Sequence, residues 1–293
     1  MKNQSHLYLL NIFFGRRLWE TDVYKNILSI LSQNGLNVSC PKIFNVEDRI
    51  QLNHNLQSGD VVIAHQPQIS IKNKKVNGFC EPQKLYNRSS KMTFLDNIGF
   101  PTMKWINGTK VKSLSELFEL WETNIVLYKK NNSFQSKGIK LLNSNSKLPD
   151  VKNGDLFCPI ITENPYTYKV DFFHNKILGS YIKQTPSVLN ENYFDWIEGD
   201  NKDQLQFPNQ NRSYFYLPFD IKSKIINLGK KITHLGGGYS SIDLMKTSDG
   251  YKAIELNISE IATKYTWLTR PVQYSKNFSK AILNLCNDYD LIK

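Results

Sequence analysis

The sequence predicts an α/β protein in which a small N-terminal parallel-sheet domain precedes a longer β-rich region. Strand-like apolar runs alternate with a helical pattern over the first 87 residues, and several strand pairs follow between residues 125 and 182. The chain has 293 residues, of which 40% are hydrophobic and 12% aromatic. Such a chain can bury more than one core, so we expect two or three packed subdomains.

The N-terminal part reads as strand, helix and strand in turn. The run Leu7–Phe13 predicts a buried strand, and the apolar spacing of Asp22–Asn34 predicts an amphipathic helix that ends at Gly35. Residues 36–38 and 61–64 predict further strands. This order is typical of a parallel sheet covered by helices, which we expect over residues 1–87.

The middle of the chain predicts a polar loop between two strands, an arrangement typical of a lid. Residues 184–218 contain several prolines and read either as a long ordered loop over a site or as a flexible crossover. The Gly236-Gly237-Gly238 run lacks the lysine of a phosphate loop and predicts the end of a helix. The elements expected here are a helix capped by Ser89 or Ser90, a helix near 115–122, strands at 125–129, 139–142, 156–161, 169–173 and 176–182, and a helix at 221–234.

Residues 241–257 alternate apolar and polar side chains on both sides of an Asp-Gly turn, which predicts a hairpin. With a three-residue loop at 248–250, Asp243 lies opposite Glu255, and Asn257 shares their face. Two carboxylates and an amide oxygen suit Mg²⁺, which takes one or two protein carboxylates together with phosphate oxygens. Judged from the hairpin alone, a metal site and acidic residues that simply face water are equally good interpretations.

Composition narrows the class of partner. The formal net charge is +11, which attracts polyanions, but the lysines are scattered and argue against a nucleic-acid-binding arm. The apolar run near the N-terminus is too short for a membrane span. The four cysteines, at positions 40, 80, 158 and 286, form no CxxC pair, which predicts reduced thiols and a cytoplasmic protein. A homo-oligomer is left open.

The order of these elements resembles the ATP-grasp superfamily, and within it the ligases that add glutamate to ribosomal protein, the glutathione-synthetase-like ligases and the graspetide-type peptide-modifying ligases. The resemblance covers residues 84–265 and implies two β-rich lobes that sandwich ATP. It divides the chain into an N-terminal substrate-side domain at 1–87, a lid subdomain at 88–165 and a C-terminal subdomain with the metal site at 166–293. Its landmarks are NRSSK at 87–91, IVLYKKNNSFQSKG at 125–138, the strand pair at 169–184, and IDLM with AIELNIS within 242–259.

The resemblance implies a nucleotide site built from both lobes. Lys91 opens the family's first helix and Lys129 ends the lid strand, and both ammonium groups are expected at the phosphates. Ser136 and Lys137 are expected to donate hydrogen bonds from a lid loop that retains only Gly138, whereas relatives carry a glycine-rich loop. Taken alone, either lysine reads as a solvated surface charge.

The remaining implied positions concern adenine, the transferred phosphate and the metal. Main-chain groups of Phe157 or Ile160 are expected to read the adenine edge. Lys183 is expected near the transferred phosphate, with Arg212 as the alternative, and each also reads as an ordinary surface or strand-end charge. The expected metal ligands are Asp243, Glu255 and Asn257.

The implied activity is an ATP- and Mg²⁺-dependent carboxylate–amine ligase that makes an amide or peptide bond through an acyl phosphate. An ester product and Mn²⁺ as the metal are alternatives. Its partners would be ATP, an amino-acid or peptide carboxylate, and an amine or hydroxyl nucleophile. Arg16, Arg17 and Arg88 read either as clamps for a substrate carboxylate or as surface charges. The glycine-poor lid loop leaves open a nucleotide-binding pseudoenzyme or regulatory protein, and the net charge alone leaves open a basic nucleic-acid-binding protein.

Overall fold

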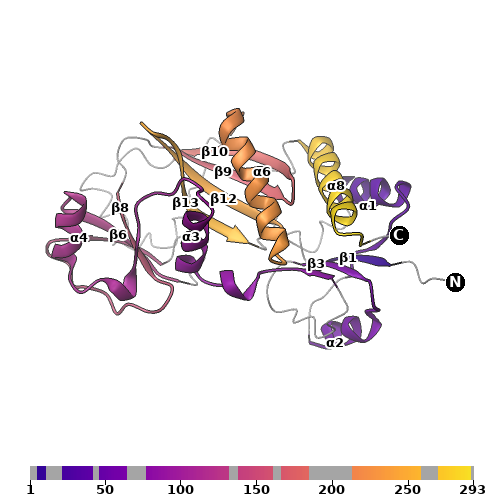
Figure 1. Ribbon diagram of the computed structural model, residues 1–293, viewed down its shortest axis with the longest axis horizontal. Coiled ribbons are helices and arrows are strands. Elements are labelled where there is room, and N and C mark those ends of the chain that lie inside the picture. The colour runs from indigo at the N-terminus through magenta and orange to yellow at the C-terminus, as the bar shows by residue number, and fades with distance from the viewer. Residues whose placement is uncertain are drawn as a thin grey trace.

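The computed structural model describes residues 5–10, 22–41, 46–64, 77–131, 138–160, 166–184, 213–258 and 270–291. The fold is α/β, as the sequence predicts, and within these ranges three sheets follow one another along the long axis of the molecule (Figure 1). We call them the N-terminal sheet, the lid sheet and the central sheet.

The N-terminal sheet is parallel throughout, which confirms the predicted α/β domain. Alternate strand residues face its two sides, so Leu9 joins the core under one helix and Leu10 joins the core under the other. Its strand order is β2 (Asn37–Ser39), β1 (His6–Leu10), β3 (Val61–Ala64), β4 (Asn77–Phe79), and its helices are α1 (Asp22–Gln33) and α2 (Val46–Asn55).

The lid sheet is antiparallel and carries the predicted strand pair. Lys129 pairs with Ile139, and the Lys130 N–H donates to the Gly138 carbonyl at 2.7 Å, which closes the base of the loop. Its strands, in spatial order, are β5 (Ile106–Asn107), β8 (Leu156–Pro159), β6 (Ile125–Lys129) and β7 (Ile139–Asn143); α4 (Leu114–Trp121) and the short helices η2 (Gln83–Leu85) and η3 (Gly108–Lys110) lie nearby in sequence.

The central sheet is antiparallel, with one apolar face and a second face on which polar residues lie beside the apolar Phe173, which packs against α8 (Pro271–Asp288). Val170, Ile242 and Leu256 point to the apolar side, where two helices cover them: α6 lies across β9 and β10, and α3 lies beside β13 (Figure 1). The strand order is β11 (Ser213–Tyr214), β10 (Lys176–Gln184), β9 (Tyr166–Phe173), β12 (Ser240–Thr247), β13 (Gly250–Ile258), and the helices are α3 (Arg88–Asn97) and α6 (Phe219–His234).

Helix α3 begins earlier than predicted. Its cap is Asn87, whose Oδ1 accepts from the Ser90 N–H at 2.7 Å, while the Asn87 N–H donates to Ser90 Oγ at 3.3 Å. The prediction of Ser89 or Ser90 as the cap was wrong because asparagine caps equally well and this reciprocal pair needs a partner three residues further on. Met92 and Leu95 then pack α3 onto the central sheet.

The β12–β13 hairpin has the predicted Asp243–Glu255 pairing, but with a shorter loop and a bulge. Thr247 pairs with Gly250, so the loop has two residues and the predicted three-residue loop was wrong. A bulge at Ile254 inserts one extra residue between the pairs Leu244–Ala253 and Asp243–Glu255. The bulge compensates for the shorter loop, and Asp243 does lie opposite Glu255.

The glycine run ends α6, as predicted. Gly236 has φ +81°, its N–H donates to the Thr233 carbonyl at 2.9 Å, and the Gly237 N–H donates to the Ile232 carbonyl at 2.9 Å. The same run bonds to Cys80 on both sides, through the Cys80 N–H at 2.7 Å and the Cys80 carbonyl at 3.1 Å. The segment after β4 is thereby fixed to the central sheet.

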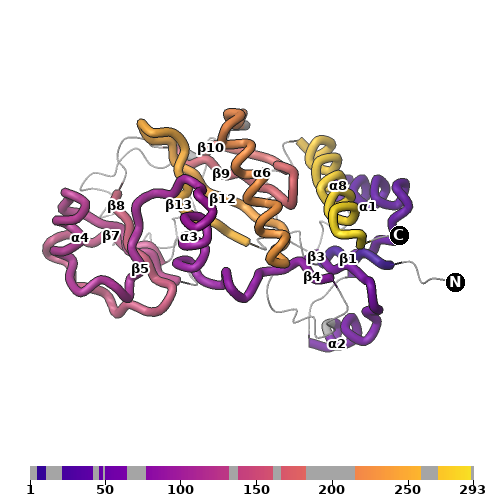
Figure 2. The backbone as a smooth tube through the Cα atoms, viewed as in Figure 1, coloured from indigo at the N-terminus to yellow at the C-terminus, as the bar shows by residue number. Residues whose placement is uncertain are grey.

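Helix α8 (Pro271–Asp288) joins the N-terminal and central sheets. It runs beside α1 (Figure 2), and Phe278, at 0% exposure, contacts the ring of Phe173 from β9. His174, in the turn between β9 and β10, is buried, and its ring nitrogens lie 2.8 Å from Asp288 Oδ2 of α8 and 2.9 Å from Thr233 Oγ1 of α6. The tip of the β9–β10 hairpin is therefore held by both helices.

Within the ranges given above, no helix combines the length and the apolar character needed to cross a membrane.

We expect Phe278→Ala to lower the free energy of unfolding by about 3–5 kcal/mol, because it opens a cavity in a fully buried aromatic cluster. Val272→Ala, at an exposed position of the same helix, should change it by no more than about 0.5 kcal/mol. Urea unfolding followed by circular dichroism measures both. Equal effects of the two substitutions would show that α8 does not hold the sheets together.

Candidate functional site

The polar face of the central sheet brings the predicted metal ligands together. Asp243 on β12 lies between Lys169 of β9 and Glu255 of β13 in the strand register. Asn257 follows Glu255 by two residues with no bulge between them, so it shares the same face. Ile242 points to the opposite face, into the core. The polar face is defined here by Lys169, Asp171, Asp243, Glu255 and Asn257.

Charged groups on this face are largely withdrawn from water. Asp243 is 7% exposed, Lys169 is 5% exposed, and Asp171 is fully buried. Charges at such depth are costly unless opposite charges and hydrogen bonds compensate them. The sequence analysis did not select Lys169 or Asp171. The available signal was the alternation in Lys169-Val170-Asp171, which puts two charged residues on one side of a strand whose other side is apolar.

Arg88 closes one side of the polar face. As the first residue of α3 it reaches across β13, and its Nη2 lies 3.2 Å from Glu255 Oε1. Both side chains are mostly buried. The sequence analysis treated Arg88 as a clamp for a substrate carboxylate or as a surface charge, and the structure instead pairs it with a candidate metal ligand.

Lys129 approaches the same region from the lid sheet. Its side chain is buried, and its Nζ donates to the carbonyl of Ile254 at 3.3 Å. Ile254 is the bulged residue of β13, so the bulge supplies the acceptor. Burial raises the pKa of the nearby Cys158 thiol, while the positive charges of Lys129 and Arg88 act in the opposite direction. Both cations therefore lie close to β8, the strand predicted to hold adenine.

Lys91 is engaged elsewhere. Its Nζ lies 2.6 Å from Glu81 Oε1, and both side chains are mostly buried. Arg88 lies one turn earlier on the same helix and contacts Glu255. The NRSSK segment therefore contributes its arginine, and not its lysine, to the contact with Glu255. A role of Lys91 at the nucleotide phosphates stays a prediction.

The two adenine candidates differ in position. Phe157 pairs with Ile106 on one side and Tyr128 on the other, and its side chain is buried in the lid core. Ile160 follows the last residue of β8. A residue between two strands has fewer main-chain groups to offer a base, so Ile160 is the better placed of the two, and its role stays a prediction.

Three predicted residues, Ser136, Lys137 and Arg212, lie outside the described residues, as do Arg16 and Arg17. Lys183 pairs with Thr167 in the β10–β9 register, two residues after Tyr181 pairs with Lys169. Its position is therefore on the side of the sheet that carries Lys169.

The donor set fits magnesium better than a transition metal. Two carboxylates and one amide oxygen leave positions for phosphate oxygens and water, which is how Mg²⁺ is commonly held in proteins. Among the described residues, no group of three or more His, Cys, Asp or Glu gathers as a self-sufficient metal cluster. The residues therefore fit Mg²⁺ that arrives together with a phosphate ligand.

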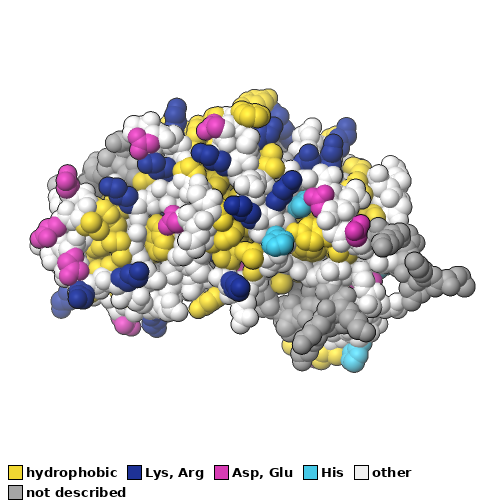
Figure 3. All heavy atoms as spheres, in the orientation of Figure 1, with side chains coloured by type: hydrophobic (Ala, Val, Ile, Leu, Met, Phe, Trp, Pro, Cys, Tyr) yellow, Lys and Arg dark blue, Asp and Glu magenta, His cyan; other side chains and the backbone are white. Residues whose placement is uncertain are grey.

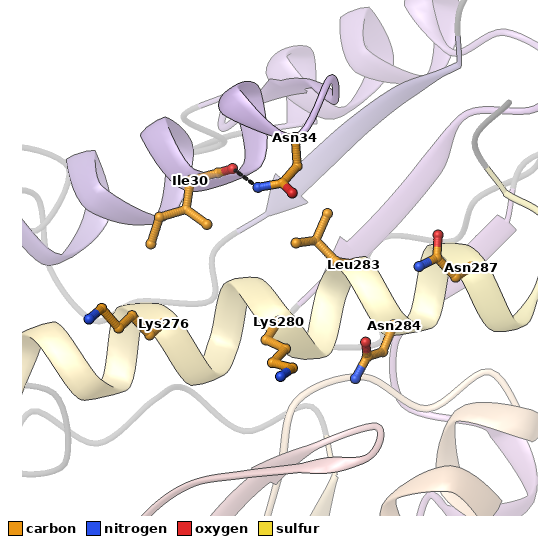
Figure 4. A pocket seen from close by; sticks show the side chains of 7 residues that line it. All are labelled: Ile30, Asn34, Lys276, Lys280, Leu283, Asn284 and Asn287. Carbon is orange, nitrogen blue, oxygen red and sulfur yellow. Dashed lines mark hydrogen bonds between the residues drawn. The ribbon is translucent and has the colours of Figure 1, made fainter.

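A separate groove of about 600 Å³ lies between α1 and α8 and shares no residue with the polar face. Ile30 of α1 and Leu283 of α8 point toward each other across it, and Lys276 and Lys280 lie along the α8 side (Figure 4). On the face of the molecule in Figure 3, basic side chains are spread singly among acidic and apolar ones. No continuous basic band is visible on that face.

Comparison with known proteins shows similarity in structure alone. No protein-family profile and no curated protein sequence matches the chain. The structure is similar to the D-alanine–D-alanine ligase from Bacillus anthracis (TM-score 0.58, 12% identity, covering 97% of this chain and 99% of that one). It is also similar to the D-cycloserine synthetase DcsG (TM-score 0.57, 12% identity, 94% and 99%) and to the ATP-grasp ligase PsnB (TM-score 0.54, 8% identity, 96% and 98%).

These similarities span nearly the whole chain, and two of the similar proteins carry the ATP-grasp name, PsnB and a RimK domain protein from Sphaerobacter thermophilus. The chain therefore has the ATP-grasp fold.

Proposed function

We propose that the protein is an ATP- and Mg²⁺-dependent, ADP-forming carboxylate–amine ligase. The observation that carries this proposal is the pairing of Asp243 with Glu255 on a buried polar face that also holds Lys169 and receives Arg88 and Lys129. Phosphoryl transfer depends mainly on positioning and on stabilising charge, for which carboxylates that hold a metal and surrounding cations are the required parts.

The proposed roles divide between metal binding and phosphate binding. Asp243, Glu255 and Asn257 would hold Mg²⁺, which neutralises phosphate charge when bound. Arg88 would turn from Glu255 toward a phosphate oxygen, and Lys129 would bring a second positive charge from the lid sheet. Lys183 or Arg212, Ser136 and Lys137 remain proposed phosphate contacts, and Lys91 is a further candidate.

The proposed chemistry has two steps. A carboxylate oxygen of the substrate attacks the γ-phosphorus of ATP, ADP leaves, and an acyl phosphate forms. An amine then attacks the acyl carbon, inorganic phosphate leaves with the bonding electrons, and the amine loses a proton to give an amide. A hydroxyl nucleophile would give an ester by the same steps. Shielding the acyl phosphate from water is the usual task of a closed lobe.

We propose an amino-acid or peptide carboxylate as the substrate, in the cytoplasm where ATP is plentiful. Two of the similar structures support this choice. One is a D-alanine–D-alanine ligase, and the other is PsnB in complex with a variant of its minimal precursor, Mg and ADP. A nucleotide-binding protein without catalysis is the second candidate, because the lid loop of this chain retains only Gly138 among the glycines common in relatives. Turnover of ATP separates the two, since a protein without catalysis releases no ADP.

Asp243→Asn and Glu255→Gln should each abolish ATP consumption, because a neutral amide weakens Mg²⁺ binding with little change in side-chain volume. Asp249→Asn is the matched control, since this carboxylate belongs to the same hairpin but lies exposed beside Lys252. ADP release in the presence of candidate carboxylates and amines is the measurement, with circular dichroism to verify folding. Folded variants that retain wild-type turnover would rule out the metal assignment.

Arg88→Gln should raise the KM for ATP at least tenfold and more than Lys91→Gln does, because only Arg88 lies against Glu255 while Lys91 is paired with Glu81. Arg88→Lys should retain part of the affinity by keeping the positive charge. Steady-state kinetics with varied ATP measures the three variants. A larger effect at Lys91 would reverse the roles assigned to these residues.

Hydroxylamine should trap a hydroxamate when ATP, Mg²⁺ and the carboxylate substrate are present without the amine. Lys129→Ala should reduce this trapping by about 10²-fold, as expected for the loss of one preorganised electrostatic donor. Lys130→Ala, at the next and exposed position, should leave it within about twofold of wild type. A product that carries a transferred phosphate, with no hydroxamate from any carboxylate, would argue for a kinase.

A further inference from the structure

A buried carboxylate ties the end of the lid strand β6 to the turn before β8. Asp155 is fully buried, and its Oδ1 accepts from the Asn131 N–H at 2.6 Å. Its Oδ2 accepts from the Lys152 N–H at 2.8 Å and from the Tyr128 hydroxyl. Burial, together with the Asp155 carboxylate, raises the pKa of Tyr128, so its hydroxyl remains a donor. Three donors therefore compensate one buried charge.

The next contact leads from the lid strand into the candidate site. Asn131 Oδ1 accepts from the backbone N–H of Arg88 at 3.1 Å. This N–H lies in the first turn of α3, where no carbonyl of the helix is available to it. The guanidinium of the same residue lies 3.2 Å from Glu255. Asp155, Asn131, Arg88 and Glu255 thus form one continuous series of polar contacts.

The backbone around this series is closely packed. Gly154 has φ +93°, and a Cβ there would lie 2.6 Å from Asn131 Nδ2 and 2.9 Å from Asn87 Cβ. A side chain at this position would displace Asn131 or the cap of α3. The Asp155 carbonyl also accepts from the Gly108 N–H at 2.8 Å, which holds the Asp155 main chain in place. Contacts to the backbone and to the side chain of Asn131 therefore both hold this residue in place.

We propose that Asp155 is a positioning residue for nucleotide binding, acting through Asn131 on Arg88. Asp155 holds the Asn131 backbone, and Asn131 holds the first residue of α3. This places the Arg88 side chain beside Glu255, from where its guanidinium can turn to the nucleotide phosphates. Neither Asp155 nor Asn131 contacts the nucleotide in this arrangement. The inference rests on the proposed function, since it needs a nucleotide at the polar face.

Mg-ATP affinity, measured by titration calorimetry, is the first readout, and Tm with and without Mg-ATP is the second. Asn131→Ala removes the acceptor for the Arg88 N–H, whereas Asn131→Asp keeps an oxygen there and is the matched control. We expect Asn131→Ala and Asp155→Asn to raise the Kd at least tenfold and to shrink the Tm increase caused by Mg-ATP. Asn131→Asp should stay within threefold of wild type.

Tyr128→Phe is the control for a purely structural effect, because it removes one donor to Asp155 and leaves the contact with Asn131 intact. It should lower the Tm without nucleotide while changing the Kd by less than twofold. If Asp155→Asn fails to fold, the pair of Asn131 variants carries the test.

A double-mutant cycle decides whether the effect passes through Arg88. In an Arg88→Gln background, Asn131→Ala should change the Kd by less than twofold, because the guanidinium that Asn131 positions is gone. An undiminished tenfold effect in that background, or an Asn131→Ala protein that loses Tm but keeps the wild-type Kd, would overturn the proposal. Failure of the wild-type protein to bind Mg-ATP would instead overturn the proposed function.

Discussion

The candidate site depends on the register of β13 against β12. With the two-residue loop alone, Ile254 would lie opposite Asp243, and Glu255 would point into the apolar core beside Ile242. The bulge at Ile254 shifts the register by one residue and brings Glu255 onto the face of Asp243. It also supplies the carbonyl to which Lys129 donates from the lid sheet. One inserted residue therefore sets both the carboxylate pair and a contact between the two sheets.

Charge balance is the second constraint on this face. Asp171 and Asp243 are buried on it together with Lys169, and the mostly buried Arg88 pairs with Glu255 at its edge. Removing one partner from a buried ion pair costs about 3–5 kcal/mol, whereas apolar residues of similar volume are often as stable as the intact pair. A fold gains little stability from such a cluster. A ligand that carries both negative phosphates and a cation would interact favourably with the charges of both signs on this face.

The sequence was most informative where a pattern was long or local. The apolar spacing of residues 22–34, with Gly35 after it, predicted α1 to within one residue, and the alternation in residues 241–257 predicted the facing pair of Asp243 and Glu255. That pair was predicted from a loop that was one residue too long, since bulges are not visible in a hydrophobic pattern. The shorter loop and the bulge shift the register by one residue in opposite directions, so the predicted pair still forms.

Other features depend on contacts between segments far apart in the chain. Asn87, Ser89 and Ser90 are all good caps, so the start of α3 was ambiguous. Arg88 and Lys91 lie one turn apart on the same helix, and only the packing of α3 beside β13 decides which of them meets Glu255. Asp155 gave no signal in the sequence, because its importance comes from its contacts with Tyr128 and Asn131 on a neighbouring strand and the turn after it.

Direct detection of the metal tests the central assignment most closely. Mn²⁺ shares the oxygen-ligand preference of Mg²⁺ and is visible by electron paramagnetic resonance, so its binding can be followed in the presence of a non-hydrolysable ATP analogue. We expect one tightly held Mn²⁺ per chain that requires the nucleotide, and loss of this signal in Asp243→Asn but not in Asp249→Asn. Unchanged Mn²⁺ binding in Asp243→Asn, or nucleotide binding that is indifferent to the metal, would contradict a metal site on the polar face.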